Sequence, residues 1–442
     1  MEGIAAHIPK QYEPKRFGKS SLYRILVDYW DEFTRVYEQR FERLCGSLRS
    51  VVERVVDRFI DCGNPLCGFA RIRCENCKKE RIRPFSCKTR GFCNSCQARF
   101  ATEWGIFLVD KLLEPVPHRH MVFTLPKILR TYFRYDRKLI NDLSRAAYKS
   151  VTKYAEYMFG NGGTLGMIAV RQHFGEAARH HPHIHVLLAE GVWNNKREFI
   201  PLFKIDAAMI QQCFEVEVFR FLRHKGLLSK ERMELIKSWH HSGFGVYLDR
   251  SLYPEDKEDM MRLARYLLRA PIALDRIDYD RDKGIVNYST DKFGVLEIDV
   301  LDFIARLSIQ VPDPYERLLV YYGLYSNASA LRKQIPVDKS DNEKEKRQVE
   351  SCDKTKVTGK LRSKKYWARL IEKIWLTDPM LCPSCGGKCR VISFITQFSV
   401  IDKILKHIGY HHKDLPKPLY RGPPCNGPPC NGPPKACKNP LG

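Results

Sequence analysis

A pair of histidines one residue apart is the first feature of the sequence whose residue types and spacing could do chemistry. The pair, His183 and His185, lies in the segment His181–Gly191, which reads HPHIHVLLAEG. Every second residue from Ile184 to Leu188 is aliphatic, and this alternation predicts a strand whose apolar face packs against helices. On the opposite face the two imidazoles would lie side by side, about 7 Å apart by the rise of a strand. Neutral imidazole is the commonest nitrogen ligand in proteins, so the pair could bind one divalent ion. Isolated His-x-His pairs are more often plain polar residues of a half-exposed strand, and the interpretation therefore depends on other segments.

A tyrosine among arginines provides a candidate nucleophile. Tyr266 lies in Asp256–Ala270, a helix-like stretch that follows the acidic turn Pro254-Glu255 and stops at Pro271. At helical spacing the stretch has a polar face with Asp259, Arg262, Tyr266 and Arg269 and an apolar face with Met260, Leu263, Ala264 and Leu267. Guanidinium groups beside a tyrosine favour its phenolate form and also hold phosphate. With a metal ion that polarises a phosphodiester, these residues suit nucleophilic attack on nucleic acid through a covalent intermediate.

Cysteine pairs predict a second kind of metal site. Two Cys-x-x-Cys pairs are separated by fifteen residues, and their members are Cys74, Cys77, Cys93 and Cys96. Each such turn places two thiolates on one ion, so the spacing predicts one structural zinc with these four ligands. Three neighbouring cysteines stand outside this scheme: Cys62, Cys67 and Cys87. Either a second zinc or packing around the first would account for them.

The histidine strand, followed by RYLLRAP at residues 265–271, resembles the HUH-endonuclease transposases of the insertion-sequence-91 type, which act by a rolling-circle route. Four further segments fit that family in order: His120–Pro126, Gln172–Gly175, Asp302–Leu307 and Val320–Leu324. The resemblance extends from about Leu44 to Leu405. It implies an α+β HUH fold with a central antiparallel sheet and helices, and a catalytic Mg²⁺ or Mn²⁺. It also implies that the zinc module binds transposon-end DNA.

The resemblance also implies roles for individual residues of the metal site. His183 and His185 would be two ligands, and Gln172 is the first candidate for the third because it matches the family's Gln-x-Phe-Gly segment. His173 and Glu176 remain alternatives. A glutamine four residues after the tyrosine, which some related small transposases use, is absent because Ala270 occupies that position.

Tyr266 corresponds to the family's nucleophile. Many members carry a second tyrosine four residues earlier, where this chain has Arg262, so it resembles the single-tyrosine branch. The second cleavage would then use Tyr266 again, a second subunit or water; Tyr247 is a weak substitute and fits a strand residue better. Arg262, Arg265 and Arg269 are expected to position phosphates.

Basic residues interleaved with aromatic ones predict contacts of the zinc module with DNA. The basic residues are Arg81, Arg83, Lys88 and Arg90, and the aromatic ones are Phe85 and Phe92. Basic side chains neutralise phosphates, and aromatic rings stack on unpaired bases.

The overall composition and net charge agree with a nucleic-acid partner. Among 442 residues, 75 are Lys or Arg and 51 are Asp or Glu, so the net charge is +24. Such a balance indicates a polyanionic partner. No apolar run approaches the ~18 residues that span a bilayer, and the first residues do not read as a signal peptide. We therefore expect a cytoplasmic, nucleoid-associated protein whose 16 cysteines are metal ligands or thiols rather than disulfides.

Composition and periodicity divide the chain into six predicted regions. They are a basic helical N-terminal region (1–60), the four-cysteine DNA-binding module (61–105), the catalytic domain (106–335), a charged linker (336–365), a C-terminal helix with a cysteine knuckle (366–421) and a Pro/Gly/Cys-rich disordered tail (422–442). In the catalytic domain we expect strands at 118–125 and 164–173, a helical region at 127–158, and short strands with charged turns at 274–309. The knuckle at Cys382 and Cys385 is half a site whose partners are not obvious; Cys389 with one of Cys425, Cys430 or Cys437 could complete it.

We therefore predict a DNA transposase that nicks single-stranded transposon ends through Tyr266, forming a 5′-phosphotyrosine. Two alternatives remain open: a replication initiator or relaxase with the same chemistry, and a zinc-dependent DNA-binding protein without nuclease activity.

Overall fold

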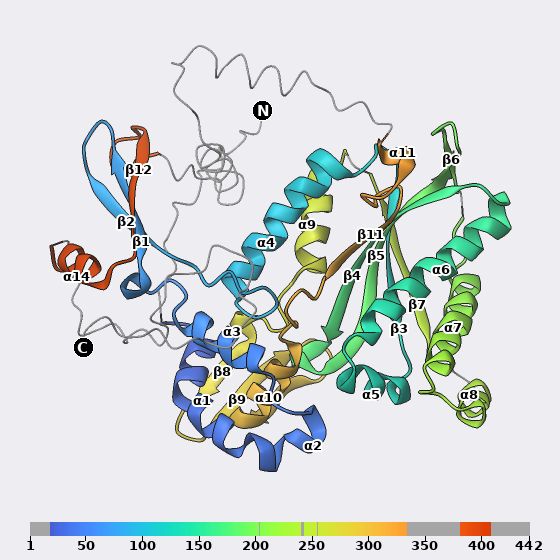
Figure 1. Ribbon diagram of the computed structural model, residues 1–442, viewed down its shortest axis with the longest axis horizontal. Helices are drawn as coiled ribbons and strands as arrows, with labels where there is room; N and C mark the ends of the chain where they lie inside the picture. The colour runs from blue at the N-terminus through green and yellow to red at the C-terminus, as the bar shows by residue number, and fades with distance from the viewer. Residues whose placement is uncertain (1–17, 203, 240–242, 254, 334–380, 408–442) are drawn as a thin grey trace, which may run out of the picture.

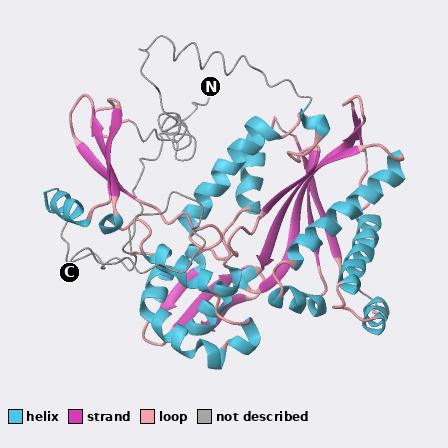
Figure 2. Cartoon of the chain, viewed as in Figure 1, coloured by secondary structure: helices cyan, strands magenta, loops and turns pink. Residues whose placement is uncertain are grey.

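A computed structural model describes residues 18–202, 204–239, 243–253, 255–333 and 381–407 (Figure 1). The predicted charged linker, the predicted C-terminal helix and the Pro/Gly/Cys-rich tail lie outside the described residues. Within the described residues the strands form one large and two small sheets, all antiparallel (Figure 2). The α+β prediction is confirmed.

The large sheet is built around the histidine strand. Its order is β11 (Leu319–Gly323), β4 (Thr164–Phe174), β5 (His180–Trp193), β3 (His118–Thr124) and β7 (Gly245–Leu252), with β6 (Phe199–Pro201) beside β5. The predicted strands at 118–125 and 164–173 and the pairing of the second with β5 are confirmed. Since β5 is central, both of its neighbours can present side chains beside the two histidines.

Helices cover both faces of this sheet (Figure 1). One face carries α5 (Lys127–Tyr135), α6 (Leu139–Phe159), α7 (Ala207–His224) and α8 (Lys230–Lys237). Ile184, Val186 and Leu188 are buried on that side, as their alternation predicts. The other face carries α4 (Asn94–Phe107), which ends in the π-helical turn η2 (Leu108–Leu112), and α9 (Lys257–Leu267). The histidine side of β5 therefore faces α9.

The N-terminal helices pack against a second, smaller sheet. The helices α1 (Ser21–Arg40), α2 (Glu42–Cys45) and α3 (Ser50–Ile60) lie beside a sheet of β8 (Ile277–Asp280), β9 (Ile285–Thr290) and β10 (Gly294–Asp299), which is flanked by η4 (Leu274–Arg276) and α10 (Val300–Gln310). Apolar side chains from α1, α3, the sheet and α10 form one core. The expectation of strands throughout 274–309 is wrong from Val300 onward, because Asp299 caps a helix there: its Oδ1 accepts from the backbone N–H groups of Leu301 and Asp302.

The third sheet joins segments that are far apart in the sequence. Its order is β12 (Cys389–Ile395), β1 (Phe69–Cys74) and β2 (Glu80–Pro84), and η1 (Pro65–Cys67) and α14 (Phe398–His407) pack beside it. We expected 366–421 to be a region of its own, but its described residues complete the sheet of the 61–105 module. The reason is that β1 has a second edge to pair, and Leu66 and Phe69 offer apolar surface to Ile401 and Leu405.

Candidate functional site

The two histidines of β5 converge on one point. Their Nε2 atoms lie 3.1 Å apart, and both rings are buried. Two ligand bonds of about 2.1 Å at roughly a right angle separate the ligand nitrogens by about 3 Å. The Nδ1 of His183 lies 2.7 Å from the carbonyl oxygen of His181, so Nδ1 donates and Nε2 keeps its lone pair. Burial lowers the pKa of both histidines, that of His183 to about 3, and holds them in the neutral form that binds metals.

Gln172 stands opposite His183 on the adjoining strand. The two residues pair directly in the β4–β5 ladder, so their side chains lie on the same face. The Nε2 of Gln172 donates to the carbonyl oxygen of Leu267 at 2.6 Å, and this contact orients the amide. Its Oε1 is buried and has no hydrogen-bond partner within the described part of the chain. An oriented, unpaired amide oxygen is a fitting third ligand for a hard divalent ion.

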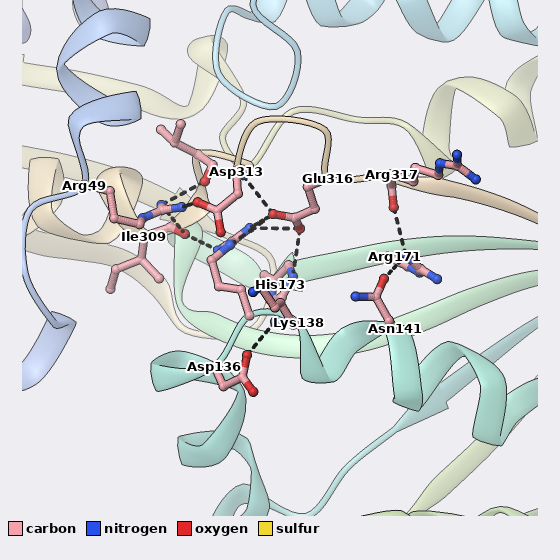
Figure 3. A network of polar contacts seen from close by, with 12 residues as sticks. Arg49, Asp136, Lys138, Asn141, Arg171, His173, Ile309, Asp313, Glu316 and Arg317 are labelled. Atoms are coloured by element: carbon pink, nitrogen blue, oxygen red, sulfur yellow. Dashed lines mark hydrogen bonds and ion pairs between the residues drawn. The ribbon is translucent and has the colours of Figure 1, made fainter. Parts of the chain in front are cut away.

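The two alternative third ligands are engaged elsewhere. His173 follows Gln172 and points to the other side of the sheet, where its Nε2 lies 3.3 Å from Glu316 Oε1 (Figure 3). Arg137 binds the same carboxylate, and burial lowers the pKa of His173 to about 4. Glu176 accepts from the backbone N–H of Asp291. Among the described residues, no third histidine, cysteine or carboxylate joins the His183–His185 pair in a ligand cluster.

Tyr266 lies over the histidines from the last turn of α9. The helix packs on the sheet through Met260, Leu263, Ala264 and Leu267, which are buried as their spacing predicts. Tyr266 is 45% exposed on the other side of the turn, and its ring centroid is 5.5 Å from that of His185. The structure therefore brings the predicted nucleophile and the predicted metal ligands into one place.

Only one of the three predicted arginines contacts this tyrosine. The Cζ of Arg269 lies 5.1 Å from the centre of the Tyr266 ring. Arg262 instead forms an ion pair with Asp259, which also binds Arg250. Arg265 is exposed on the last turn of α9.

His120 is a site residue whose role the sequence did not reveal. Its Nε2 lies 3.0 Å from Nδ1 of His185, and the two rings stack. Its Nδ1 lies 3.5 Å from Oδ2 of Asp249 on β7. The backbone N–H of Arg250 and the neighbouring His120 lower the pKa of Asp249, which keeps this carboxyl ionised. The signal was present, because His120 opens one of the family-like segments and lies on the His185 face by strand alternation.

The cysteines form two clusters, and the predicted grouping of zinc ligands is wrong. One cluster holds Cys62, Cys87, Cys93 and Cys96, and the other holds Cys74, Cys77, Cys382 and Cys385. The β1–β2 hairpin carries the turn at Cys74 away from the start of α4, where Cys93 and Cys96 lie. Neighbouring Sγ atoms within the clusters are 3.5 to 3.9 Å apart. Four thiolates around zinc, with bonds of about 2.3 Å, would be about 3.8 Å apart.

The predicted DNA contacts of the zinc module have mixed environments. Arg81 on β2 donates to the carbonyl oxygen of Leu381 at 3.4 Å, and Arg83 lies on the same strand. Lys88 is exposed, and the guanidinium of Arg90 lies over the ring of Phe100. Of the two aromatic residues expected to stack on bases, Phe92 is buried against Phe59, whereas Phe85 stacks with the exposed Phe394.

The chain is similar in sequence to known transposases. Residues 26–125 match the family model of the transposase zinc-binding domain, and residues 166–333 match a model described as putative transposase. The chain is 22% identical over 376 residues to the transposase for insertion sequence element IS801 of Pseudomonas savastanoi pv. phaseolicola, across 80% of this chain and 87% of that protein. It is 28% identical over 321 residues to putative transposase y4qJ of Sinorhizobium fredii (strain NBRC 101917 / NGR234), across 66% and 79%. No solved structure is significantly similar to it.

The fold, the cysteine clusters and these matches define the class of the protein, which is a DNA-processing transposase with a zinc-binding domain. Within that class, the chain belongs to the insertion-sequence-91 type. No helix of the described residues is both long and apolar enough to cross a bilayer.

Proposed function

We propose that this transposase cleaves single-stranded DNA at the ends of its element with Tyr266 as nucleophile. The observation that carries the proposal is the position of the Tyr266 ring, 5.5 Å from His185, beside two imidazole Nε2 atoms that converge at 3.1 Å. The family matches support action on DNA, and the geometry supports this particular chemistry.

Each residue of the site has a task in the proposed reaction. His183 and His185 would hold Mg²⁺ or Mn²⁺ through Nε2, and Gln172 through Oε1. Such an ion, when bound, acts as a Lewis acid toward a phosphodiester oxygen. The Oη of Tyr266 attacks the phosphorus and releases its proton, and the bond between phosphorus and the 3′ oxygen breaks. The leaving oxygen takes up a proton and becomes a 3′-hydroxyl, while the 5′ end remains on the enzyme as a phosphotyrosine.

The covalent link conserves the energy of the phosphodiester bond, so strand joining needs no ATP. The free 3′-hydroxyl can prime replication, and a target strand can later attack the phosphotyrosine. The exposed guanidinium groups of Arg265 and Arg269 would bind phosphates that flank the scissile bond. Because Arg262 is paired with Asp259, its part in this binding is expected to be smaller.

The test is a cleavage assay on the purified full chain with labelled single-stranded DNA that carries the element's own ends. We expect a covalent protein–DNA adduct on Tyr266 in Mn²⁺ and none in chelator. Tyr266→Phe should abolish the adduct and preserve DNA binding. Denaturing electrophoresis and mass spectrometry of the adduct provide the measurement.

Tyr247 is the matched control. It lies on β7, where its register places it on the same face of the sheet as His185, and it is 63% exposed. Tyr247→Phe should cleave like the unchanged protein if one tyrosine suffices. Cleavage that survives Tyr266→Phe would refute the assignment. Salt-sensitive DNA binding without an adduct in any variant would instead support a binding protein without nuclease activity.

A further inference from the structure

We propose that the chain holds two structural zinc ions, and that the second, bound by Cys74, Cys77, Cys382 and Cys385, fastens the C-terminal segment to the N-terminal module. The matched zinc-binding domain ends at residue 125, so it includes only half of this ligand set. The inference does not depend on Tyr266 or on DNA cleavage.

The distances between the four thiols fit one ion. Cys74 Sγ lies 3.5 Å from Cys385 Sγ, and Cys77 Sγ lies 3.6 Å from Cys382 Sγ. All four sulfur atoms lie within 4.8 Å of one another. These separations are far longer than a disulfide bond of about 2.05 Å and close to the edge of a zinc tetrahedron, about 3.8 Å. Four thiolates in this arrangement select zinc over hard ions such as Mg²⁺.

The two halves of the site share a left-handed residue directly after the second cysteine. Lys78 has φ 61° and Gly386 has φ 67°. The backbone N–H of Cys77 points at Cys74 Sγ, 3.4 Å away, and the backbone N–H of Gly386 donates to the carbonyl oxygen of Cys382. A left-handed residue turns the chain sharply around the ion. For Lys78, which unlike glycine pays a steric cost there, this conformation indicates a turn shaped by its surroundings.

Backbone contacts align the two turns. The N–H of Glu75 donates to the carbonyl oxygen of Lys388 at 2.8 Å, and Cys74 pairs with Cys389 in the β1–β12 ladder. The ion would thus hold together one end of the β12–β1–β2 sheet. Elsewhere in the module, an apolar cluster is formed by Leu66, Phe69, Ile401 and Leu405.

The charges around the site agree with a bound zinc. Four thiolates and one Zn²⁺ carry a net charge of −2, which needs nearby positive charge. Arg73, Lys78 and Arg390 line a hollow beside Cys74, and among the described residues Glu75 is the one acidic residue that lines it with them. Their net positive charge would offset the negative charge of the thiolate cluster.

The experiment measures zinc per chain by native mass spectrometry on the full-length protein, purified without added metal. We expect two zinc ions for the unchanged chain and one for the double variant Cys382→Ser, Cys385→Ser. Cys93→Ser should also lower the count to one by emptying the first cluster. Cys389→Ser is the matched control, because Cys389 is buried beside Cys74 but stands outside both ligand clusters of the described chain, and it should retain two ions.

Hydrogen exchange provides the second readout. In the double variant, the amides of β12 and α14 should exchange at least tenfold faster, while those of β4 and β5 stay unchanged. The proposal is overturned by one zinc in the unchanged chain, by two zinc ions in the double variant, by a metal other than zinc, or by unaltered exchange in β12. None of these results depends on cleavage, so the failure of one proposal leaves the other standing.

Discussion

We expect His120 to set which nitrogen of His185 is free for the proposed metal ion. The Nδ1 of His185 faces Nε2 of His120, and the Nδ1 of His120 faces the carboxylate of Asp249. If protons lie on both Nδ1 atoms, each ring donates to the next acceptor, and His185 Nε2 keeps its lone pair toward His183. Partners of this kind orient metal-bound histidines and typically contribute 10- to 100-fold to metal affinity.

We therefore expect His120→Ala to raise the Mn²⁺ concentration needed for half-maximal cleavage by about 10- to 100-fold, with a smaller effect for Asp249→Asn. Calorimetric titration of Mn²⁺ into the DNA-free protein should show the same loss of affinity. His118→Asn is the control, because His118 lies two residues away on β3 but contacts Tyr325 instead. Equal Mn²⁺ affinity in His120→Ala and the unchanged protein would contradict the role of His120.

Buried neutral histidines should also make the fold sensitive to acid. Burial lowers the pKa of His173 to about 4 from an ordinary value of 6.5. Above pH 6.5 the ring is neutral in both the folded and the unfolded chain and adds no pH dependence. Between pH 6.5 and about 4 the unfolded chain binds a proton that the folded chain does not, so the free energy of unfolding falls as the pH falls. Over that window His173 should contribute a loss on the order of 3 kcal/mol.

Urea unfolding at pH 7 and pH 5 measures this effect. His173→Gln should reduce the difference between the two pH values, whereas His224→Gln, at the exposed end of α7, should leave it unchanged. An unfolding free energy that is flat from pH 7 to pH 5 would contradict the prediction.

Residue spacing along the chain predicted the pairs that are close in sequence and missed those made by tertiary contact. His183 and His185 share a strand face by alternation, and Tyr266 stands on a polar helix face by periodicity. The contact of His120 with His185 requires the β3–β5 register, and the union of Cys74 with Cys385 spans 311 positions. No local pattern encodes either pairing.

At the scale of elements, α9 positions Tyr266, and the packing of α9 against α4 sets how closely α9 approaches the sheet. Gly105 of α4 is the point of contact: a Cβ there would lie 2.9 Å from Met261 Sδ and 3.0 Å from Ala264 Cβ. These contacts leave no room for a branched side chain without a shift of α9.

Gly105→Val should therefore displace α9, lower the rate of cleavage at least tenfold and destabilise the fold by about 1 to 3 kcal/mol. Mn²⁺ affinity should fall less than the rate, because the histidines belong to the sheet and α9 affects only the Gln172 amide, which the carbonyl of Leu267 orients. Ala98→Val, on the exposed side of α4, is the matched control and should leave both the cleavage rate and the stability unchanged. A loss of Mn²⁺ affinity as large as the loss of rate would show that the sheet, rather than α9, had moved.

Elements were easier to predict than their partners. The amphipathic periodicity of α1 and α3 correctly indicated helices, and capping by Asp299 explains the helix at 300–310 that was missed. No local signal indicated that these helices cover the β8–β9–β10 sheet, which lies more than 200 residues later within the predicted catalytic domain. An amphipathic helix indicates that its apolar face packs against another element, but it does not identify that element.

At the scale of the molecule, the chain passes through β1 and β2 of the zinc module, builds the catalytic sheet and returns to the module with β12 (Figure 1). The order of regions along the sequence therefore differs from their arrangement in space. Composition shifts mark where regions change, but only the pairing of β1 with β12 shows that these two distant segments share one sheet.

This return has a consequence for biosynthesis. Because a ribosome makes the chain from its N-terminus, β1 and the thiols of Cys74 and Cys77 emerge long before β12, Cys382 and Cys385 do. All strands of the large sheet have been synthesised once Gly323 is made. The β12–β1–β2 sheet is complete only after the segment that ends in Ile395 has been synthesised. A prematurely ended polypeptide would thus keep the residues proposed to cleave DNA but lack β12, and so it would have an incomplete zinc module. Completion of the zinc module therefore depends on Cys385, which is synthesised 311 positions after Cys74.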